Sequence, residues 1–143
     1  MKPYLQQHFK TYAGTADIYV YFVEQAFNIL RQGGEFAYIL PNKWMRAVYG
    51  KALRQWTQAQ QLHQIIDFGD LPVFEEATTY PIIWTMQKAA PSTSLFAAVR
   101  AETLDFEDLA AYAQTHQYAV DKNLLQDSSW TLVDYNIQLL LEK

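Results

Sequence analysis

The sequence of 143 residues contains no cysteine, so disulfide bonds and thiolate metal sites are excluded. It also lacks long apolar runs. Residues 1–8 have no signal-peptide core, and no segment approaches the ~20 apolar residues that a membrane-spanning helix needs. We therefore expect a cytoplasmic protein without a membrane partner.

Positive charge is scarce, because 11 Lys and Arg against 15 Asp and Glu give a formal net charge of −4. Proteins that grip DNA unaided neutralise phosphates with many basic side chains. If DNA is a partner, most of the contacts with it must come from other parts of a larger protein. Apolar residues make up 50% of the chain, which is enough for a buried core.

Several patterns of catalytic residues are also missing or carry no function. The three histidines lie far apart without ligand spacing, so we expect no metal site: His8, His63 and His116. The Asp67-Phe68-Gly69 triplet lacks the other kinase motifs. The adjacent Glu75 and Glu76 are typical of a solvated loop, and no Asp is followed by the Glu-x-Lys of a nuclease core.

Apolar residues recur at helical spacing between residues 15 and 32 and predict a helix there: Ile18, Phe22, Ala26 and Ile29. Thr15 is expected to cap its first turn, and Gly33 and Gly34 to end it. The apolar run 36–40 that follows is typical of a strand buried on both faces. Helix followed by strand suggests an α/β unit.

The alternation of helix and strand continues along the chain. We predict a helix over 49–58, a strand over 62–68 and a β segment over 78–86, with Pro81 at its start or on an unpaired edge. Composition shifts at residues 89–94 and marks a boundary. Beyond it we expect a strand over 95–99, a helix over 105–115 capped by Asp105, and an amphipathic stretch from Tyr135.

The order of these segments resembles the second half of a gamma-class amino-methyltransferase. Four segments carry the resemblance: residues 16–24, 33–44, 65–68 and 73–80. Together they resemble the helix after the family's Asn-Pro-Pro-Tyr motif, the next strand with its Pro-Asn-Lys-Trp turn, the strand after it, and the motif beside the target base. The similarity runs over residues 2–88 and is greatest to fused restriction enzyme/methylase polypeptides.

This resemblance implies an α/β fold, the C-terminal half of a Rossmann-like S-adenosylmethionine-dependent methyltransferase sheet. Residues 1–89 would be a partial methyltransferase domain, and residues 90–143 a connector and the start of a target-recognition domain. The intact protein would methylate adenine in double-stranded DNA. Neither the glycine-rich cofactor loop nor Asn-Pro-Pro-Tyr is present, so no catalytic residue can be assigned and the chain alone is expected to be inactive.

Two aromatic residues match family positions. Phe22 matches a phenylalanine that lines the adenine pocket of the cofactor, although its helical spacing equally suits a core residue. Phe74 matches a phenylalanine that packs against the flipped target adenine, where an aromatic wall restores part of the lost stacking. An ordinary loop anchor is the alternative for Phe74.

The resemblance also implies partners. An incomplete sheet leaves a strand edge and apolar surface exposed, so we expect either self-association or dependence on the N-terminal half of the methyltransferase domain. The alternative reading is a non-catalytic α/β interaction module that shares this order of elements. An Asn-Pro-Pro-Tyr motif encoded shortly upstream would favour the methyltransferase.

Overall fold

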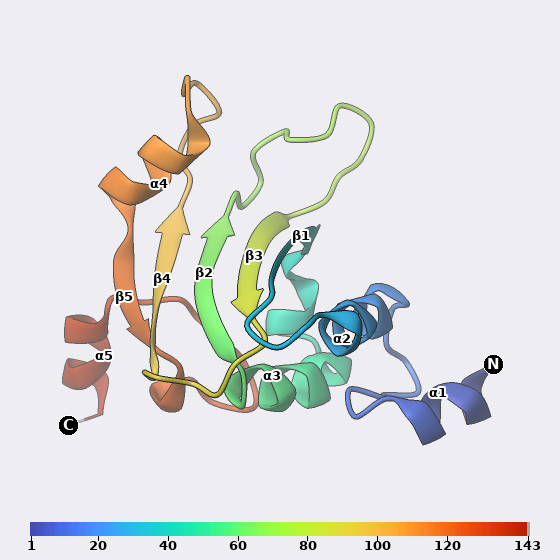
Figure 1. Ribbon diagram of the computed structural model, residues 1–143. Coiled ribbons are helices and arrows are strands. Elements are labelled where there is room, and N and C mark those ends of the chain that lie inside the picture. Colours follow the sequence, from blue (N-terminus) through green and yellow to red (C-terminus); the bar gives the residue numbers. More distant parts are fainter. Residues whose placement is uncertain (143) are drawn as a thin grey trace.

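The computed structural model describes residues 1–142, in which five strands form one sheet in the order β1-β3-β2-β4-β5 (Figure 1). The strands are β1 (Glu35–Pro41), β2 (Gln61–Asp67), β3 (Pro81–Gln87), β4 (Leu95–Arg100) and β5 (Tyr118–Asp121). β2 and β4 pair in parallel, and the other neighbours are antiparallel. The carboxyl ends of β1, β2 and β4 therefore meet at one end of the sheet.

Helices cover both faces of this sheet. The α-helices are α1 (Lys2–His8), α2 (Tyr19–Ile29), α3 (Lys51–Gln58), α4 (Leu109–His116) and α5 (Tyr135–Leu141), with 3-10 turns at Asn42–Met45, Val48–Gly50 and Lys122–Leu124. Side chains alternate between the faces of a strand. Ile65 packs with residues of α2 and α3, whereas Ile66 packs with Ala113 of α4. None of the helices in residues 1–142 is long and apolar enough to cross a membrane.

Three buried tryptophans in the larger of the two hydrophobic cores connect residues 44 and 84 with residue 130 in the C-terminal part of the chain. Trp44 stacks on Trp84 with ring centroids 4.7 Å apart, and Trp130 meets Trp44 edge-on at 5.4 Å. The buried Arg54 of α3 donates hydrogen bonds to the carbonyls of Ala47 and Asp127 at 2.9 and 2.8 Å. Residues after 89 therefore share the core of residues 1–89, and the functional division at residue 89 stays a prediction.

The predicted positions of the strands are largely confirmed, but the predicted burial of β1 is not. β1, β2 and β4 lie within one or two residues of the predicted ranges, and Pro81 is the first residue of β3. The prediction that residues 36–40 are buried on both faces is wrong, because β1 is an edge strand and its residues are mostly exposed. Within residues 1–142 nothing pairs with its outer edge.

The helix boundaries differ from the predicted ones. α2 begins at Tyr19 rather than at 15, and its N-cap is Ile18 without a side-chain cap. It ends at Ile29, and Gly33, with φ of 78°, forms the turn into β1. α4 begins at Leu109 and is capped by Asp108, which accepts from the backbone N–H of Ala110, instead of Asp105. The predicted start at 105 lies in irregular chain.

Candidate functional site

A hollow of about 670 Å³ lies where β1 ends and β3 begins. We call it the Asn42 hollow, and its polar lining comprises Asp17, Asn42, Lys43, Arg46, Thr78, Thr79 and Tyr80. The backbone N–H of Asn42 donates to the carbonyl of Tyr80 at 2.8 Å, which joins the two walls. In open α/β sheets, ligands bind beside the carboxyl ends of strands, and this hollow has that position.

A chain of hydroxyl groups fixes the Asp17 carboxylate at this hollow. The hydroxyl of Tyr49 donates to Asp17 Oδ2 at 3.2 Å, and it lies 2.8 Å from the hydroxyl of Tyr19. Burial raises the pKa of Tyr19 and the pKa of Tyr49. Both phenols therefore stay protonated near neutral pH and remain able to donate toward the carboxylate.

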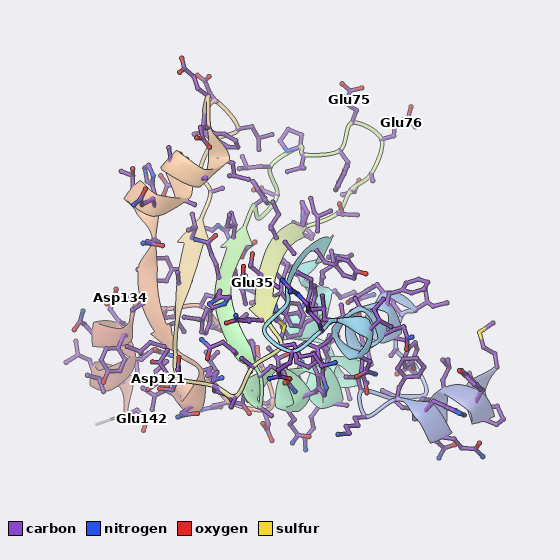
Figure 2. The ribbon with its side chains drawn as sticks, viewed as in Figure 1. Glu35, Glu75, Glu76, Asp121, Asp134 and Glu142 are labelled. Atoms are coloured by element: carbon purple, nitrogen blue, oxygen red, sulfur yellow. The ribbon has the colours of Figure 1, made fainter. Side chains whose placement is uncertain are left out.

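Phe74 lies on the loop that connects β2 to β3. Its side chain is 45% exposed and lines a second hollow of about 320 Å³. The two hollows share residues 78–80, and the hydroxyl of Thr79 is buried without a hydrogen-bond partner. Phe74 is thus an accessible ring next to the Asn42 hollow. Figure 2 shows Glu75 and Glu76 pointing outward from the tip of this loop, and both are exposed.

Phe22 lies on the outer face of α2 and is 57% exposed. Ile18 and Ile29 share this exposed stripe, whereas Val20 and Val23 of the same helix are fully buried. Phe22 is therefore not a core residue, and the core interpretation of its helical spacing is wrong. It lines neither of the two hollows described above, so the structure does not bring Phe22 and Phe74 together in one cavity.

Two positively charged side chains line the Asn42 hollow, although the chain has a net charge of −4. Lys43 and Arg46 are exposed, and neither forms an ion pair with any residue in 1–142. Sequence reasoning included Asn42 and Lys43 in the Pro-Asn-Lys-Trp turn but assigned no site role to them or to Arg46. The available signal was the Pro41-Asn42 turn directly after an apolar strand.

The Asp67-Phe68-Gly69 triplet has a structural role. Asp67 Oδ1 accepts from the N–H of Gly69 at 2.8 Å, and Asp67 Oδ2 pairs with Arg100 at 3.0 Å. Gly69 has φ of 55°, a conformation that favours glycine, and Phe68 is buried in the smaller core. The triplet therefore closes β2 and starts the Phe74 loop.

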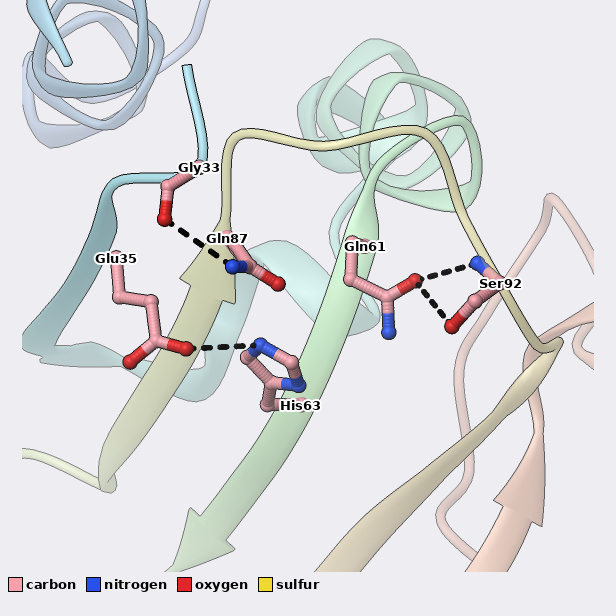
Figure 3. Close-up of polar contacts among 6 residues, drawn as sticks. All are labelled: Gly33, Glu35, Gln61, His63, Gln87 and Ser92. Carbon is pink, nitrogen blue, oxygen red and sulfur yellow. Dashed lines mark hydrogen bonds and ion pairs between the residues drawn. The ribbon is translucent and has the colours of Figure 1, made fainter. Parts of the chain in front are cut away.

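The histidines have local contacts. His63 Nε2 lies 3.4 Å from Glu35 Oε1, near the contacts of Gln87 with Gly33 and of Gln61 with Ser92 (Figure 3). This polar group lies at the end of the sheet opposite to the Asn42 hollow. His8 and His116 each contact the carbonyl four residues earlier. Among residues 1–142 no cluster of three or more His, Asp or Glu could hold a metal ion.

Comparison with known proteins identifies the family. The model of the Eco57I restriction-modification methylase matches residues 1–74, which is more than half of the 143 residues. The chain belongs to this family. The resemblance drawn from the sequence is thereby confirmed at the level of restriction-modification methylases.

Two relatives show how much of a family member this chain covers. The type II restriction enzyme and methyltransferase RM.Eco57I of Escherichia coli is 29% identical over 119 residues, which are 81% of this chain and 12% of that protein. The type II methyltransferase M.PaeR7I of Pseudomonas aeruginosa is 32% identical over 81 residues, 54% of this chain and 14% of that protein. The chain therefore spans about one eighth of these relatives.

Solved structures of methyltransferases have the same fold. The methyltransferase subunit of a type I restriction-modification system from Streptococcus thermophilus superposes with a TM-score of 0.63 at 10% identity, over 78% of this chain and 28% of that one. A protein of Listeria monocytogenes assigned to the class I S-adenosylmethionine-dependent methyltransferases gives 0.58 at 14% identity, over 76% of this chain and 35% of that one. The expected α/β methyltransferase fold is confirmed.

Proposed function

We propose that this chain forms one wall of the active centre of a site-specific DNA adenine methyltransferase. The intact enzyme would transfer a methyl group from S-adenosylmethionine to the exocyclic amino nitrogen of adenine, in a restriction-modification or phage-defence system. The observation that carries this proposal is the Asn42 hollow at the carboxyl ends of the strands, with the accessible Phe74 beside it, in a chain of this family.

Phe74 is the proposed wall for the target base. A base that leaves the DNA stack loses its stacking energy, and an exposed aromatic ring next to a hollow can restore part of it. The adjacent Asn42 amide supplies polar groups for the edge of the base. This arrangement favours capture of a flipped nucleotide over an ordinary loop anchor.

Phe22 is the proposed wall for the cofactor. An exposed aromatic ring with apolar neighbours on the same helical stripe suits the flat face of the adenine in S-adenosylmethionine. The cofactor, when bound, supplies the methyl group that is transferred. Phe22 would orient it and exclude water from one side of its adenine ring.

The remaining walls would come from the preceding half of the methyltransferase domain. That half would carry the glycine-rich loop and the Asn-Pro-Pro-Tyr motif, neither of which occurs in these 143 residues. β1 is the outermost strand on one side of the sheet, its outer edge is unpaired within residues 1–142, and Figure 1 shows α2 beside it. A strand of the preceding half would pair with β1, and double-stranded DNA would bind to the assembled protein.

A non-catalytic interaction module is the second candidate. The free edge of β1 and the exposed stripe of α2 would also serve a domain that only assembles with other proteins. The absence of the catalytic motif from the sequence favours this reading for the chain by itself.

Methyl transfer by a reconstituted protein tests the proposal. The chain would be mixed with the separately expressed preceding half, labelled S-adenosylmethionine and DNA, and the nucleosides would be separated by mass spectrometry. We expect label in N6-methyladenine only when both halves are present. Label in a methylated cytosine would contradict adenine specificity, and no transfer by a stable complex would favour the interaction module.

A further inference from the structure

A smaller hollow of about 240 Å³ lies next to the Asn42 hollow, at the carboxyl ends of β2 and β4. We call it the Arg100 hollow. Asn42 and Arg46 line both hollows, and Arg100 and Trp130 line only the smaller one. A ligand that occupies both hollows would therefore cross the Asn42 and Arg46 side chains.

The lining of the Arg100 hollow carries unused positive charge. Its one carboxylate, Asp67, is already satisfied, because Oδ1 accepts from Gly69 and Oδ2 pairs with Arg100 at 3.0 Å. Arg46 has no ion pair among residues 1–142, and the side chain of Arg100 is 54% exposed despite its partner. Two guanidinium groups against one carboxylate leave a net charge of +1 in a chain whose net charge is −4.

Trp130 lies in the same lining and is fully buried. Its indole N–H has no hydrogen-bond partner among residues 1–142, and the same holds for Trp44 and Trp84 outside the lining, so Trp130 serves here as a reporter beside the hollow and not as a ligand donor. The free donors of Arg46 and Arg100 suit a group that presents several acceptor oxygens and a negative charge.

We propose that the Arg100 hollow binds a phosphate group of the DNA backbone next to the base captured in the Asn42 hollow. This inference rests on the proposed function, because it assigns the place of the DNA strand at that same site. Phosphate presents acceptor oxygens to the donor fork of arginine. A phosphate lies one sugar away from its base, and two hollows that share Asn42 and Arg46 provide that adjacency.

The inference can be tested on the chain itself by the NMR signals of its indole N–H groups. The sequence has four tryptophans, so substitution of Trp130 by Phe identifies its signal among four. A single-stranded DNA oligonucleotide would be titrated into the chain at low salt, and inorganic phosphate would be titrated separately. We expect the Trp130 signal to move and saturate with DNA.

Arg46→Gln should weaken this DNA titration about five- to tenfold, because it removes one charge-assisted donor. It should also reduce the slope of log affinity against log salt by about one. Arg31→Gln, which removes an exposed arginine elsewhere, is the matched control and should leave both values unchanged.

Three results would overturn the inference: a Trp130 signal that does not move with DNA, movement with inorganic phosphate but not with DNA, or equal effects of Arg46→Gln and Arg31→Gln. Methyl transfer by the reconstituted protein separates this failure from failure of the proposed function. Adenine methylation together with an unmoved Trp130 signal would reject the phosphate site alone.

Discussion

At the scale of single residues, Phe74 separates a role in binding from a role in stability. Its ring is 45% exposed, so Phe74→Ala should change the free energy of unfolding by less than about 0.5 kcal/mol. In the reconstituted enzyme the same substitution should weaken capture of the target base by about 1–3 kcal/mol. Fluorescence of 2-aminopurine at the target position would measure this.

Leu104→Ala is the control for this substitution, because Leu104 is an exposed apolar residue of another loop. It should leave base capture unchanged. Unchanged turnover and unchanged DNA binding in Phe74→Ala would remove Phe74 from the proposed site.

The stability of the chain should depend on tyrosine ionisation at alkaline pH. Burial and the hydrogen bond with Tyr49 raise the pKa of Tyr19, so the folded state favours the neutral phenol. The stability associated with this group is complete below about pH 10, the ordinary pKa of tyrosine, and is lost as the pH rises above it. Tyr19→Phe should therefore flatten the alkaline fall of the urea midpoint. An equally steep fall in the variant would contradict this assignment.

Single residues also show where sequence reasoning stops. The order of motifs was enough to single out Phe74, but its exposure became clear only from its position on the loop between β2 and β3. Phe22 was harder, because a wide apolar stripe does not tell which part of it faces the core. The answer depends on which helix face packs on the sheet, and Val20 and Val23 pack there instead.

At the scale of elements, the free edge of β1 should cause self-association. Ile39 on this strand is 48% exposed, and edge strands with apolar side chains invite pairing with another chain. Sedimentation of the chain alone should show concentration-dependent oligomers, and Ile39→Lys should shift the population to monomers. The matched control is Leu140→Lys on α5, a helix that packs against β5 at the opposite edge of the sheet.

A monomer at all concentrations, or equal effects of the two lysine substitutions, would show that the edge of β1 does not drive association. The stripe of α2 would then be the next surface to test.

The strands after residue 89 should be needed for folding. β4 pairs with β2 in parallel, and Trp130 packs against Trp44. A chain cut after residue 89 would expose the inner edge of β2 and leave a cavity in place of a buried tryptophan, a change that costs about 3–5 kcal/mol by itself. We expect its circular dichroism to lack a cooperative thermal transition. A cooperative transition would show that residues 1–89 fold independently.

Elements with a strong local signal were predicted from the sequence, and those fixed by distant contacts were not. β1 and β3 have glycine or proline at their entry and a continuous apolar run. β5 has only four residues and is fixed by pairing with β4. The edge position of β1 could not be predicted, because a continuous apolar run is typical of a central strand.

At the scale of the whole molecule, the proposed binding hollows and the proposed assembly surfaces lie on different parts of the sheet. The Asn42 and Arg100 hollows share the carboxyl end of the sheet, whereas the edge of β1 and the stripe of α2 remain uncovered in residues 1–142. The relatives RM.Eco57I and M.PaeR7I are about eight and seven times as long as the parts aligned with this chain. We interpret the chain as one side of a methyltransferase active centre. The catalytic motif and the cofactor loop would come from elsewhere in such a protein.

Calorimetry of S-adenosylmethionine binding tests this central claim most directly. The cofactor would be titrated into the chain alone, into the preceding half alone, and into their mixture. We predict binding only in the mixture, with the affinity reduced by Phe22→Ala. Binding in none of the three samples, when both halves are folded and associated, would contradict the account and favour the interaction module.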